Sequence, residues 1–347
     1  MKKIKVGVSI GDLSGIGLEI IIKTFKDSRM MDFCTPIIFG SAQAASIHRK
    51  ALEMQNFNFH VIHDIKDINH KKANLFSIWN KDLDITIGSP SIKSGELAFD
   101  SLKKATTALK NKNIDALVTA PINKSSIQKK ITNFIGHTEF LEGNFEGDAL
   151  MIMASEKMKI AFVTSHIPLN EVKNKITINN VITKTEQLNT ALTQDFGIRK
   201  PKIAILGLNP HAGENGLLGI EENEQITPAI KKLKEQNILA FGPYPADSFF
   251  TSKNLTNFDG ILSMYHDQGL TAFKTLSFSN GVNFTAGLSI IRTSPVHGTA
   301  YEIAGQGIAD EKSFREAVFM ACNIHKKRSE FKLLNQNPLE FKRQKQT

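Results

Sequence analysis

Short apolar runs alternate with amphipathic stretches along most of the chain, and each run is bounded by polar or glycine-rich residues. Such runs are typical of short buried strands. The predicted strands cover residues 5–10, 35–39, 59–62, 115–120, 149–153, 160–164, 202–206 and 258–262. Between them the helical spacing of apolar residues predicts helices over about residues 42–52, 94–109, 176–192, 299–305 and 314–325. Strands that alternate with helices indicate an α/β fold with a largely parallel sheet.

The length and composition fit a soluble protein with more than one core. A chain of 347 residues is long enough for two domains. Its 41% hydrophobic and 22% charged residues are ordinary for globular proteins. No apolar run reaches the roughly 18 residues of a membrane span, and the first run ends at Gly11 and Asp12. With only Cys34 and Cys322, no disulfide framework is expected, so we predict a reduced, cytoplasmic protein without a membrane partner.

The basic character of the chain changes this picture little. The formal net charge is +9 and the pI is about 9.3. The basic residues are scattered among acidic ones, and no nucleic-acid-binding motif is present. We therefore expect no nucleic-acid partner, whereas an excess of positive charge suits phosphorylated small molecules.

A glycine-rich turn at residues 11–17 (GDLSGIG) follows the first predicted strand. Glycines before a helix start can let the backbone approach an anion. The same composition also suits a tight strand-to-helix turn with no ligand. Because the spacing is not GxGxxG, we infer no Rossmann nucleotide site here.

Three histidines each come just after a predicted strand, in turns rich in small and polar residues: His166, His211 and His266. The carboxyl ends of parallel strands meet at one edge of a sheet, which predicts one shared site. Neutral imidazole is the commonest zinc ligand, and three protein ligands with an open position are typical of catalytic metal sites. No HExxH or CxxC spacing supports a metal, and His266 with Asp267 would equally suit a helix cap.

Further polar residues suggest an anionic ligand. Lys274, Asn283 and Arg292 follow at intervals too irregular for one helix face. We interpret them as converging on a small anion from several loops, with surface charge as the alternative. His137 and Thr138 lie near a predicted helix start and suit either a phosphate contact or a cap. Asp247 suits a carboxylate that orients a metal-binding histidine, or again a cap.

Several motifs resemble 4-hydroxythreonine-4-phosphate dehydrogenases, and the resemblance covers nearly the whole chain. The matching segments are residues 136–139 (GHTE), 209–214 (NPHAGE), 242–247 (GPYPAD), 264–269 (MYHDQG), 273–276 (FKTL), 292–295 (RTSP), 297–299 (HGT) and 304–305 (AG). The resemblance implies that His166, His211 and His266 bind a divalent metal. It also implies substrate contacts by the residues His137, Thr138, Lys274, Asn283 and Arg292. Leu13, Leu18, Val296 and Gln306 depart from the residues common in the family.

The resemblance also implies an architecture. We expect two α/β domains with a cleft between them, like those of isocitrate and isopropylmalate dehydrogenases. The first domain would comprise residues 1–135 plus about 296–347. The second, about 136–295, would carry most metal and substrate residues. The family forms homodimers in which both subunits build each active site.

The expected activity is the metal-dependent, NAD- or NADP-linked oxidation of 4-phosphohydroxy-L-threonine, a step toward pyridoxal 5'-phosphate. We expect Zn²⁺, Mg²⁺ or Co²⁺ as the metal, and catalytic roles for Lys274, Asp247 and Asp267. No residues are assigned to the nicotinamide cofactor. The alternatives are a 4-phospho-D-threonate or erythronate dehydrogenase, an acyl- or phosphoryl-transfer enzyme on the same fold, and a metal-binding dimer without catalysis.

Overall fold

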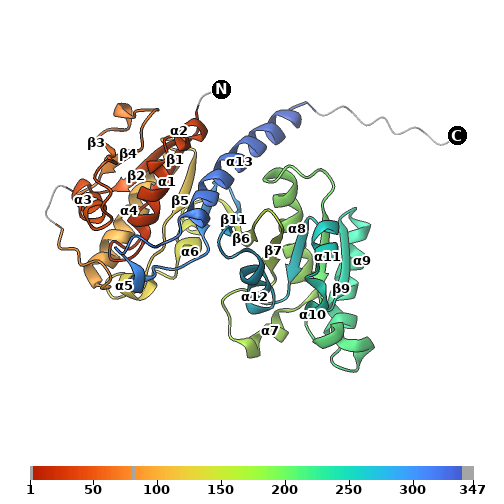
Figure 1. Cartoon of the computed structure of the whole chain (residues 1–347). Helices are drawn as coiled ribbons and strands as arrows, with labels where there is room; N and C mark the ends of the chain where they lie inside the picture. The colour runs from red at the N-terminus through yellow and green to blue at the C-terminus, as the bar shows by residue number, and fades with distance from the viewer. Residues whose placement is uncertain (1–2, 80–82, 338–347) are drawn as a thin grey trace.

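A single twelve-stranded sheet forms the centre of the computed structural model, which describes residues 3–79 and 83–337 (Figure 1). The strand order within this described part is β3-β4-β2-β1-β5-β12-β11-β6-β7-β10-β8-β9. The strands are β1 (Lys5–Ser9), β2 (Thr35–Gly40), β3 (His60–Ile62), β4 (Asn74–Ser77), β5 (Ala116–Thr119), β6 (Gly147–Ala154), β7 (Lys159–Phe162), β8 (Lys202–Leu206), β9 (Leu239–Tyr244), β10 (Gly260–Ser263), β11 (Val282–Leu288) and β12 (Arg292–Pro295).

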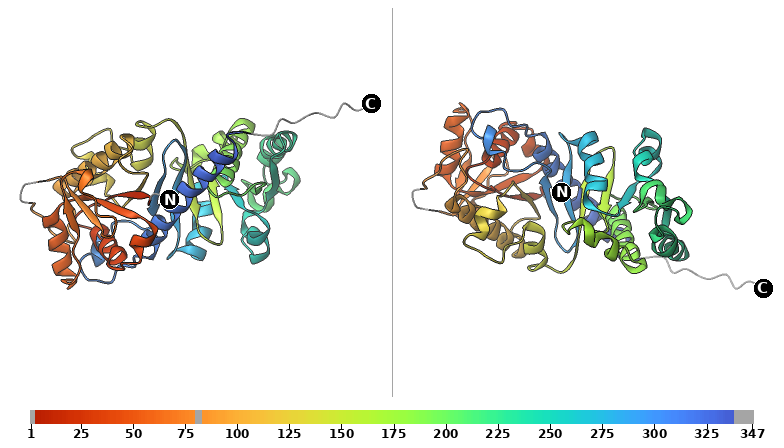
Figure 2. Two further views of the ribbon diagram at one scale, coloured as in Figure 1. Left: turned by 90° about the horizontal axis from the view of Figure 1, so that it is seen from above. Right: turned by 90° about the horizontal axis from the view of Figure 1, so that it is seen from below.

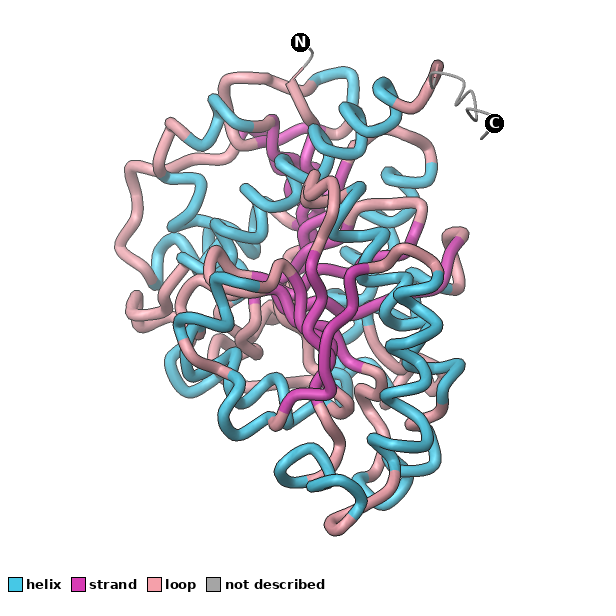
Figure 3. Tube along the Cα trace, turned by 90° about the vertical axis from the view of Figure 1, so that its right-hand side faces the viewer, coloured by secondary structure: helices cyan, strands magenta, loops and turns pink. Residues whose placement is uncertain are grey.

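Helices cover both faces of the sheet (Figure 3). They are α1 (Gly17–Lys26), α2 (Met30–Phe33), α3 (Ala42–Ala51), α4 (Ile92–Lys110), α5 (Lys124–Gln128), α6 (His137–Glu142), α7 (Leu169–Lys175), α8 (Ile178–Gln194), α9 (Thr227–Glu235), α10 (Ala246–Phe249), α11 (Ser252–Asn257), α12 (His266–Ser277) and α13 (Lys312–Leu334). Short 3-10 segments cover Ile65–Asp67, Pro210–Gly216 and Tyr301–Ile303, and a π segment covers Glu222–Ile226. Among the described residues, none of these helices is both long and apolar enough to cross a bilayer.

Two parallel halves of the sheet are joined by antiparallel strands at its centre. The strands from β3 to β12 pair in parallel, and so do the strands from β7 to β9. Between them, β11 pairs antiparallel with β12 and β6, and β6 pairs antiparallel with β7. The two halves therefore run in opposite directions. The α/β prediction with a largely parallel sheet is confirmed.

The last helix returns to the first half of the sheet. Helix α13 packs against β12, β11, β5 and β1, and Figure 2 shows it crossing the middle of the molecule. This path accords with a discontinuous first domain. The predicted boundaries, at residues 135 and 296, stay a prediction because the sheet is continuous across both.

The glycine-rich turn before α1 is closed by packing. Residues 11 to 17 are all buried, and a Cβ on Gly15 would lie 2.7 Å from the carbonyl oxygen of Thr299. A Cβ on Gly17 would lie 2.4 Å from the carbonyl oxygen of Ile10. The ligand-free interpretation of this turn therefore accounts for its glycines.

One predicted helix is wrong, and the four strands β4, β9, β11 and β12 were not predicted. Residues 299–305 form a loop with a single 3-10 turn, since Ala300 (φ 42°) and Gly305 (φ 77°) adopt left-handed backbone conformations. Strands β11 and β12 were expected to be loops. Their polar residues Asn283 and Arg292 interrupt the apolar pattern because these side chains line a pocket instead of the core.

Candidate active site

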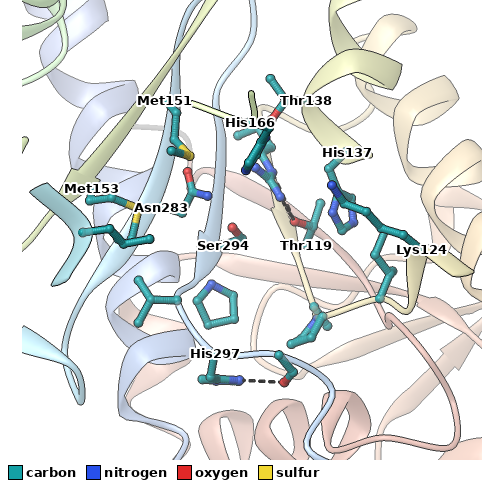
Figure 4. A pocket seen from close by; sticks show the side chains of 18 of the residues that line it. Thr119, Lys124, His137, Thr138, Met151, Met153, His166, Asn283, Ser294 and His297 are labelled. Atoms are coloured by element: carbon teal, nitrogen blue, oxygen red, sulfur yellow. Dashed lines mark hydrogen bonds between the residues drawn. The ribbon is translucent and has the colours of Figure 1, made fainter. Parts of the chain in front are cut away.

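The central antiparallel strands form the floor of a pocket of about 280 Å³ (Figure 4). Side chains alternate between the faces of a strand, so the register determines which residues share a face. Asn283 pairs with both Ser294 and Met153 across neighbouring strands. Two residues along, Thr285 pairs with Arg292 and Met151. These six side chains therefore stand on one face of the sheet, and five of them line the pocket: Met151, Met153, Asn283, Arg292 and Ser294.

Segments after strands of both halves form the walls of the pocket. Lys124 begins α5, just after β5, and His137 begins α6. From the other half, His166 follows β7 and His266 begins α12 directly after β10. Because β7 and β10 are parallel neighbours, these two imidazoles emerge at the same edge, with ring centroids 5.6 Å apart.

Seven of the ten residues predicted for the site line this one pocket: His137, Thr138, His166, His266, Lys274, Asn283 and Arg292. The expected convergence is therefore present in the structure. The expectation that the anion-binding residues come from loops is wrong, because Lys274 lies on α12, Asn283 on β11 and Arg292 on β12. The specific roles of the seven residues stay predictions.

The other three predicted residues do not line the pocket. His211 is exposed and begins a stretch, residues 211 to 216, in which every φ is positive. Asp247 and Asp267 line a neighbouring depression beside α10 and α12. Asp267 still reaches the site through its neighbour, since its Oδ1 lies 2.6 Å from Nδ1 of His266. The helix-cap alternative for this pair is wrong, because Tyr265 occupies the cap position and no side chain caps α12.

The metal-ligand prediction is only partly reflected in the geometry. His166 and His266 face each other, and His211 follows β8, the strand next to β10. Across residues 3–79 and 83–337, however, no three His, Cys, Asp or Glu side chains are grouped closely enough to hold a metal ion. Within one chain the rings of His166 and His266 are therefore adjacent, whereas His211 lies apart from them, after the neighbouring strand β8.

Arg292 is a buried cation that hydroxyl groups alone hold in place. Its side chain is 3% exposed. Thr119 Oγ1 accepts hydrogen bonds from Nη2 (2.7 Å) and Nε (3.1 Å), and Thr285 Oγ1 accepts one from Nη1 (3.1 Å). Burial lowers the pKa of Arg292 to about 10, with the charge of Glu139 opposing. No described carboxylate lies within 4.0 Å of the guanidinium. An uncompensated buried charge is costly, so this arrangement suits an anionic ligand.

Burial and nearby positive charge keep two of the pocket histidines neutral. The pKa of His137 lies well below its ordinary value because of burial, with further lowering by Arg292 and Lys124. Burial also lowers the pKa of His166, as do Lys124 and His266, while Glu139 opposes. Neutral imidazole is the form that binds metals.

Three buried polar atoms in the pocket have no hydrogen-bond partner in the described structure: Nε2 of His137, Oδ1 of Asn283 and Nε2 of His297. Buried polar groups are nearly always paired, by protein, water or ligand. Their position on the lining therefore indicates that a polar ligand completes their hydrogen bonding.

Five polar residues of the lining were not predicted as site residues: Thr119, Lys124, Glu139, Ser294 and His297. For Thr119 and Lys124 a signal was present, because both lie at or just past the end of the predicted strand 115–120. Ser294 lies within the RTSP segment and His297 within the HGT segment. For these two, no residue pattern separated a pocket contact from an ordinary turn.

Comparison with known proteins identifies the family. The family model described as "Pyridoxal phosphate biosynthetic protein PdxA" matches residues 32–321. A 4-hydroxythreonine-4-phosphate dehydrogenase of Bacteroides thetaiotaomicron is 45% identical over 340 residues, which is 97% of this chain and 93% of that protein. A protein of Oceanobacillus iheyensis, provisionally named as a D-threonate 4-phosphate dehydrogenase, is 38% identical and covers 93% of this chain and 98% of its own length.

Solved structures agree with the sequence relatives. The crystal structure of 4-hydroxythreonine-4-phosphate dehydrogenase from Klebsiella pneumoniae has a TM-score of 0.78 at 32% identity, covering 94% of this chain and 98% of that one. A terephthalate dihydrodiol dehydrogenase of Burkholderia xenovorans (TM-score 0.60, 22% identity, 92% and 98% coverage) shares the fold alone. The fold is therefore the two-domain α/β fold of these dehydrogenases, as expected. Since the family model covers most of its length, the chain belongs to the PdxA family of pyridoxal phosphate biosynthetic proteins.

Proposed function

We propose that this chain is a metal-dependent, NAD- or NADP-linked 4-hydroxythreonine-4-phosphate dehydrogenase. It oxidises 4-phosphohydroxy-L-threonine to 2-amino-3-oxo-4-phosphobutanoate, which then loses carbon dioxide to give 3-amino-2-oxopropyl phosphate. The observation that carries the proposal is the pairing, in one pocket, of a buried guanidinium lacking a carboxylate partner with two facing imidazoles. A phosphorylated hydroxy-amino acid needs both an anion site and a site for its reacting hydroxyl group.

The anion site uses residues of the sheet floor and α12. The Arg292 guanidinium offers a planar fork for two oxygens of one anion, and Lys274 adds a point charge. Asn283 brings an amide whose buried Oδ1 still lacks a donor. His137, being neutral, and Thr138 contribute hydrogen bonds without adding charge. Together these groups bind and orient the substrate before oxidation.

The donor chemistry at the other side of the pocket fits a divalent metal. His166 and His266 would hold it with His211, and a bound metal would lower the pKa of the substrate hydroxyl and stabilise negative charge on its oxygen. Oδ1 of Asp267 accepts a hydrogen bond from Nδ1–H of His266, which leaves Nε2 free as a ligand atom. We assign Asp247 a supporting role beside α12, and Lys274 the proton transfer from the substrate.

A bound nicotinamide cofactor would supply the acceptor for the hydride of the secondary alcohol. The proposal includes a homodimer in which residues of both subunits complete each site. The exposure of His211, outside the pocket of its own chain, supports a shared site. It also includes a cytoplasmic location, where the buried thiols of Cys34 and Cys322 stay reduced.

The second candidate is oxidation of 4-phospho-D-threonate, which the Oceanobacillus iheyensis relative favours. The two substrates differ in an amino versus a hydroxyl group at C2. Steady-state kinetics with each, followed by nicotinamide reduction, separate the candidates. We expect the larger kcat/KM for 4-phosphohydroxy-L-threonine. A larger kcat/KM for 4-phospho-D-threonate would overturn the main proposal in favour of the second.

A further inference from the structure

We infer that Lys124 is a further substrate-binding residue and that it contacts the phosphate group together with Arg292. This inference rests on the proposed function, since it assigns one end of that substrate to one end of the pocket. Lys124 is the first residue of α5 and lines the pocket. Figure 4 shows its side chain extending alongside the ring of His137.

The position of the ammonium group follows from the neighbouring glycine. A Cβ on Gly136 would lie 3.1 Å from Nζ and 3.2 Å from Cε of Lys124, and 2.7 Å from Oε2 of Glu139. Residue 136 precedes His137, so the lysine head group occupies the space that a side chain at this position would fill. The backbone of Gly136 is extended (φ 174°) and suits any residue. Its glycine therefore serves to make room for these side chains.

Lys124 and Arg292 act on the same histidine. The positive charges of both lower the pKa of His137, and both side chains line the same pocket as its ring. The buried Nε2 of that ring has no partner among the described residues. Two cations and an unpaired imidazole nitrogen thus line the same pocket.

The charges indicate which end of the substrate fits there. The charged residues of the lining are Lys124, Lys274, Arg292 and Glu139, which is three positive minus one negative, or a net charge of +2. A phosphate monoester carries close to two negative charges at neutral pH, whereas a carboxylate carries one. Two cations that line the same pocket match a phosphate. The two residues then have different roles: the rigid guanidinium of Arg292 orients the phosphate, and the flexible side chain of Lys124 adds positive charge.

No described carboxylate forms an ion pair with this lysine, although that of Glu139 borders the same space beside Gly136. None lies within 4.0 Å of its Nζ, and none of its neighbours accepts a hydrogen bond from it. By contrast, Lys130 at the other end of the same segment pairs with Glu96 at 2.7 Å. The ammonium group of Lys124 is therefore available to a ligand.

The test compares Lys124→Met, Lys124→Arg, Gly136→Ala and a control, Lys129→Met. Lys129 is exposed, directly follows α5 at its C-terminal cap and does not line the pocket. Binding of inorganic phosphate is measured by calorimetry on the intact protein, alongside KM and kcat for 4-phosphohydroxy-L-threonine. We expect Lys124→Met to weaken phosphate binding and raise KM about ten- to a hundredfold, the effect of one charge-assisted hydrogen bond, with kcat changed far less. Lys124→Arg should recover most of the loss, and Gly136→Ala should lose affinity by displacing the ammonium group.

Two results would overturn the inference. One is wild-type phosphate affinity in Lys124→Met. The other is an equal loss in Lys129→Met, which would mean a general charge effect. Phosphate binding is measured without turnover. The role of Lys124 is therefore tested independently of the proposed dehydrogenase activity. A wild-type protein that binds phosphate through Lys124 but oxidises neither phosphorylated substrate would refute the dehydrogenase proposal and keep Lys124 in an anion site.

Discussion

The hydroxyl oxygen of Thr119 accepts two hydrogen bonds from Arg292, at 2.7 Å from Nη2 and 3.1 Å from Nε. The two residues are 173 positions apart in sequence. They meet because β5 and β12 are parallel neighbours in which Arg292 pairs with Leu117. Strand pairing, rather than a loop, therefore aims the guanidinium into the pocket.

Replacing Thr119 with Val keeps the shape of the residue 119 side chain but removes its hydroxyl group. The guanidinium of Arg292 should then be held less firmly in position. Two N–H donors of a buried cation lose their acceptor, which costs about 1–3 kcal/mol in the free energy of unfolding. We also expect KM for the phosphorylated substrate to rise several-fold, as measured by steady-state kinetics. Thr293→Val is the matched control, because buried Thr293 donates to the carbonyl oxygen of Ala317 and does not touch Arg292. It should lower stability and leave KM unchanged; a similar KM in all three proteins would remove the positioning role of Thr119.

Changes at Arg292 test which group it binds. Arg292→Lys keeps the charge but loses the two-donor fork, so kcat/KM should fall roughly ten- to a hundredfold for the phosphorylated substrate. Arg292→Ala should be worse, since the anion then faces the pocket without this counter-charge.

A double-mutant cycle combines each Arg292 substitution with a substrate that lacks the phosphate group. The wild-type kcat/KM for this substrate should be low. If Arg292 binds the phosphate, either Arg292 variant should lower that kcat/KM only a little further. Equal losses on both substrates would mean that Arg292 contacts the carboxylate or only supports the sheet. Wild-type kinetics in both variants would show that Arg292 is purely structural.

His211→Ala should abolish metal binding and activity while leaving the fold intact. Losing one of three ligands cripples an open metal site, and the exposed position of His211 makes the substitution harmless to the core. Metal content by elemental analysis and far-UV circular dichroism are the measurements. Stoichiometric metal with wild-type turnover in the variant would exclude His211 from the site.

The free energy of unfolding should depend on pH through the lowered pKa of buried His137. Burial lowers the pKa of His137 in the folded state, whereas in the unfolded chain it is about 6.5. The folded protein therefore binds fewer protons than the unfolded chain below that pH. The stabilisation is fully present above pH about 6.5 and is lost as the pH falls. His137→Asn should flatten the decline in the free energy of unfolding between pH about 6.5 and 5; an unchanged slope would mean that His137 is protonated in the native state.

Sequence patterns predicted the elements that bury apolar residues along their whole length. The buried strands β1, β2, β5 and β8 and the helix α4 lie where the apolar periodicity predicts them. The same reasoning missed the short strand β4 and the edge strand β9. It also missed β11 and β12, because Asn283 and Arg292 face a pocket and break the pattern. It also missed the antiparallel centre of the sheet, since strand direction depends on pairing between distant segments.

In the candidate site, too, sequence patterns predicted the residues that follow strands but not those whose role depends on contacts between distant segments. Histidines after adjacent parallel strands were expected to lie together, and His166 and His266 do. Lys124 was not among the predicted site residues, because its relation to His137 depends on how α5 and α6 approach each other around Gly136. Thr119 resembled any buried strand residue until its pairing with β12 was known.

The most direct test of the central claim is an absorbance assay of nicotinamide reduction with purified protein and 4-phosphohydroxy-L-threonine, before and after a chelator. NAD and NADP are each supplied, and metal content is measured at every step. We predict reduced nicotinamide with one or both cofactors, loss of the rate as metal is removed, and recovery when Zn²⁺, Mg²⁺ or Co²⁺ is added back. No nicotinamide reduction under any of these conditions, or a full rate in protein shown to be free of metal, would contradict the account.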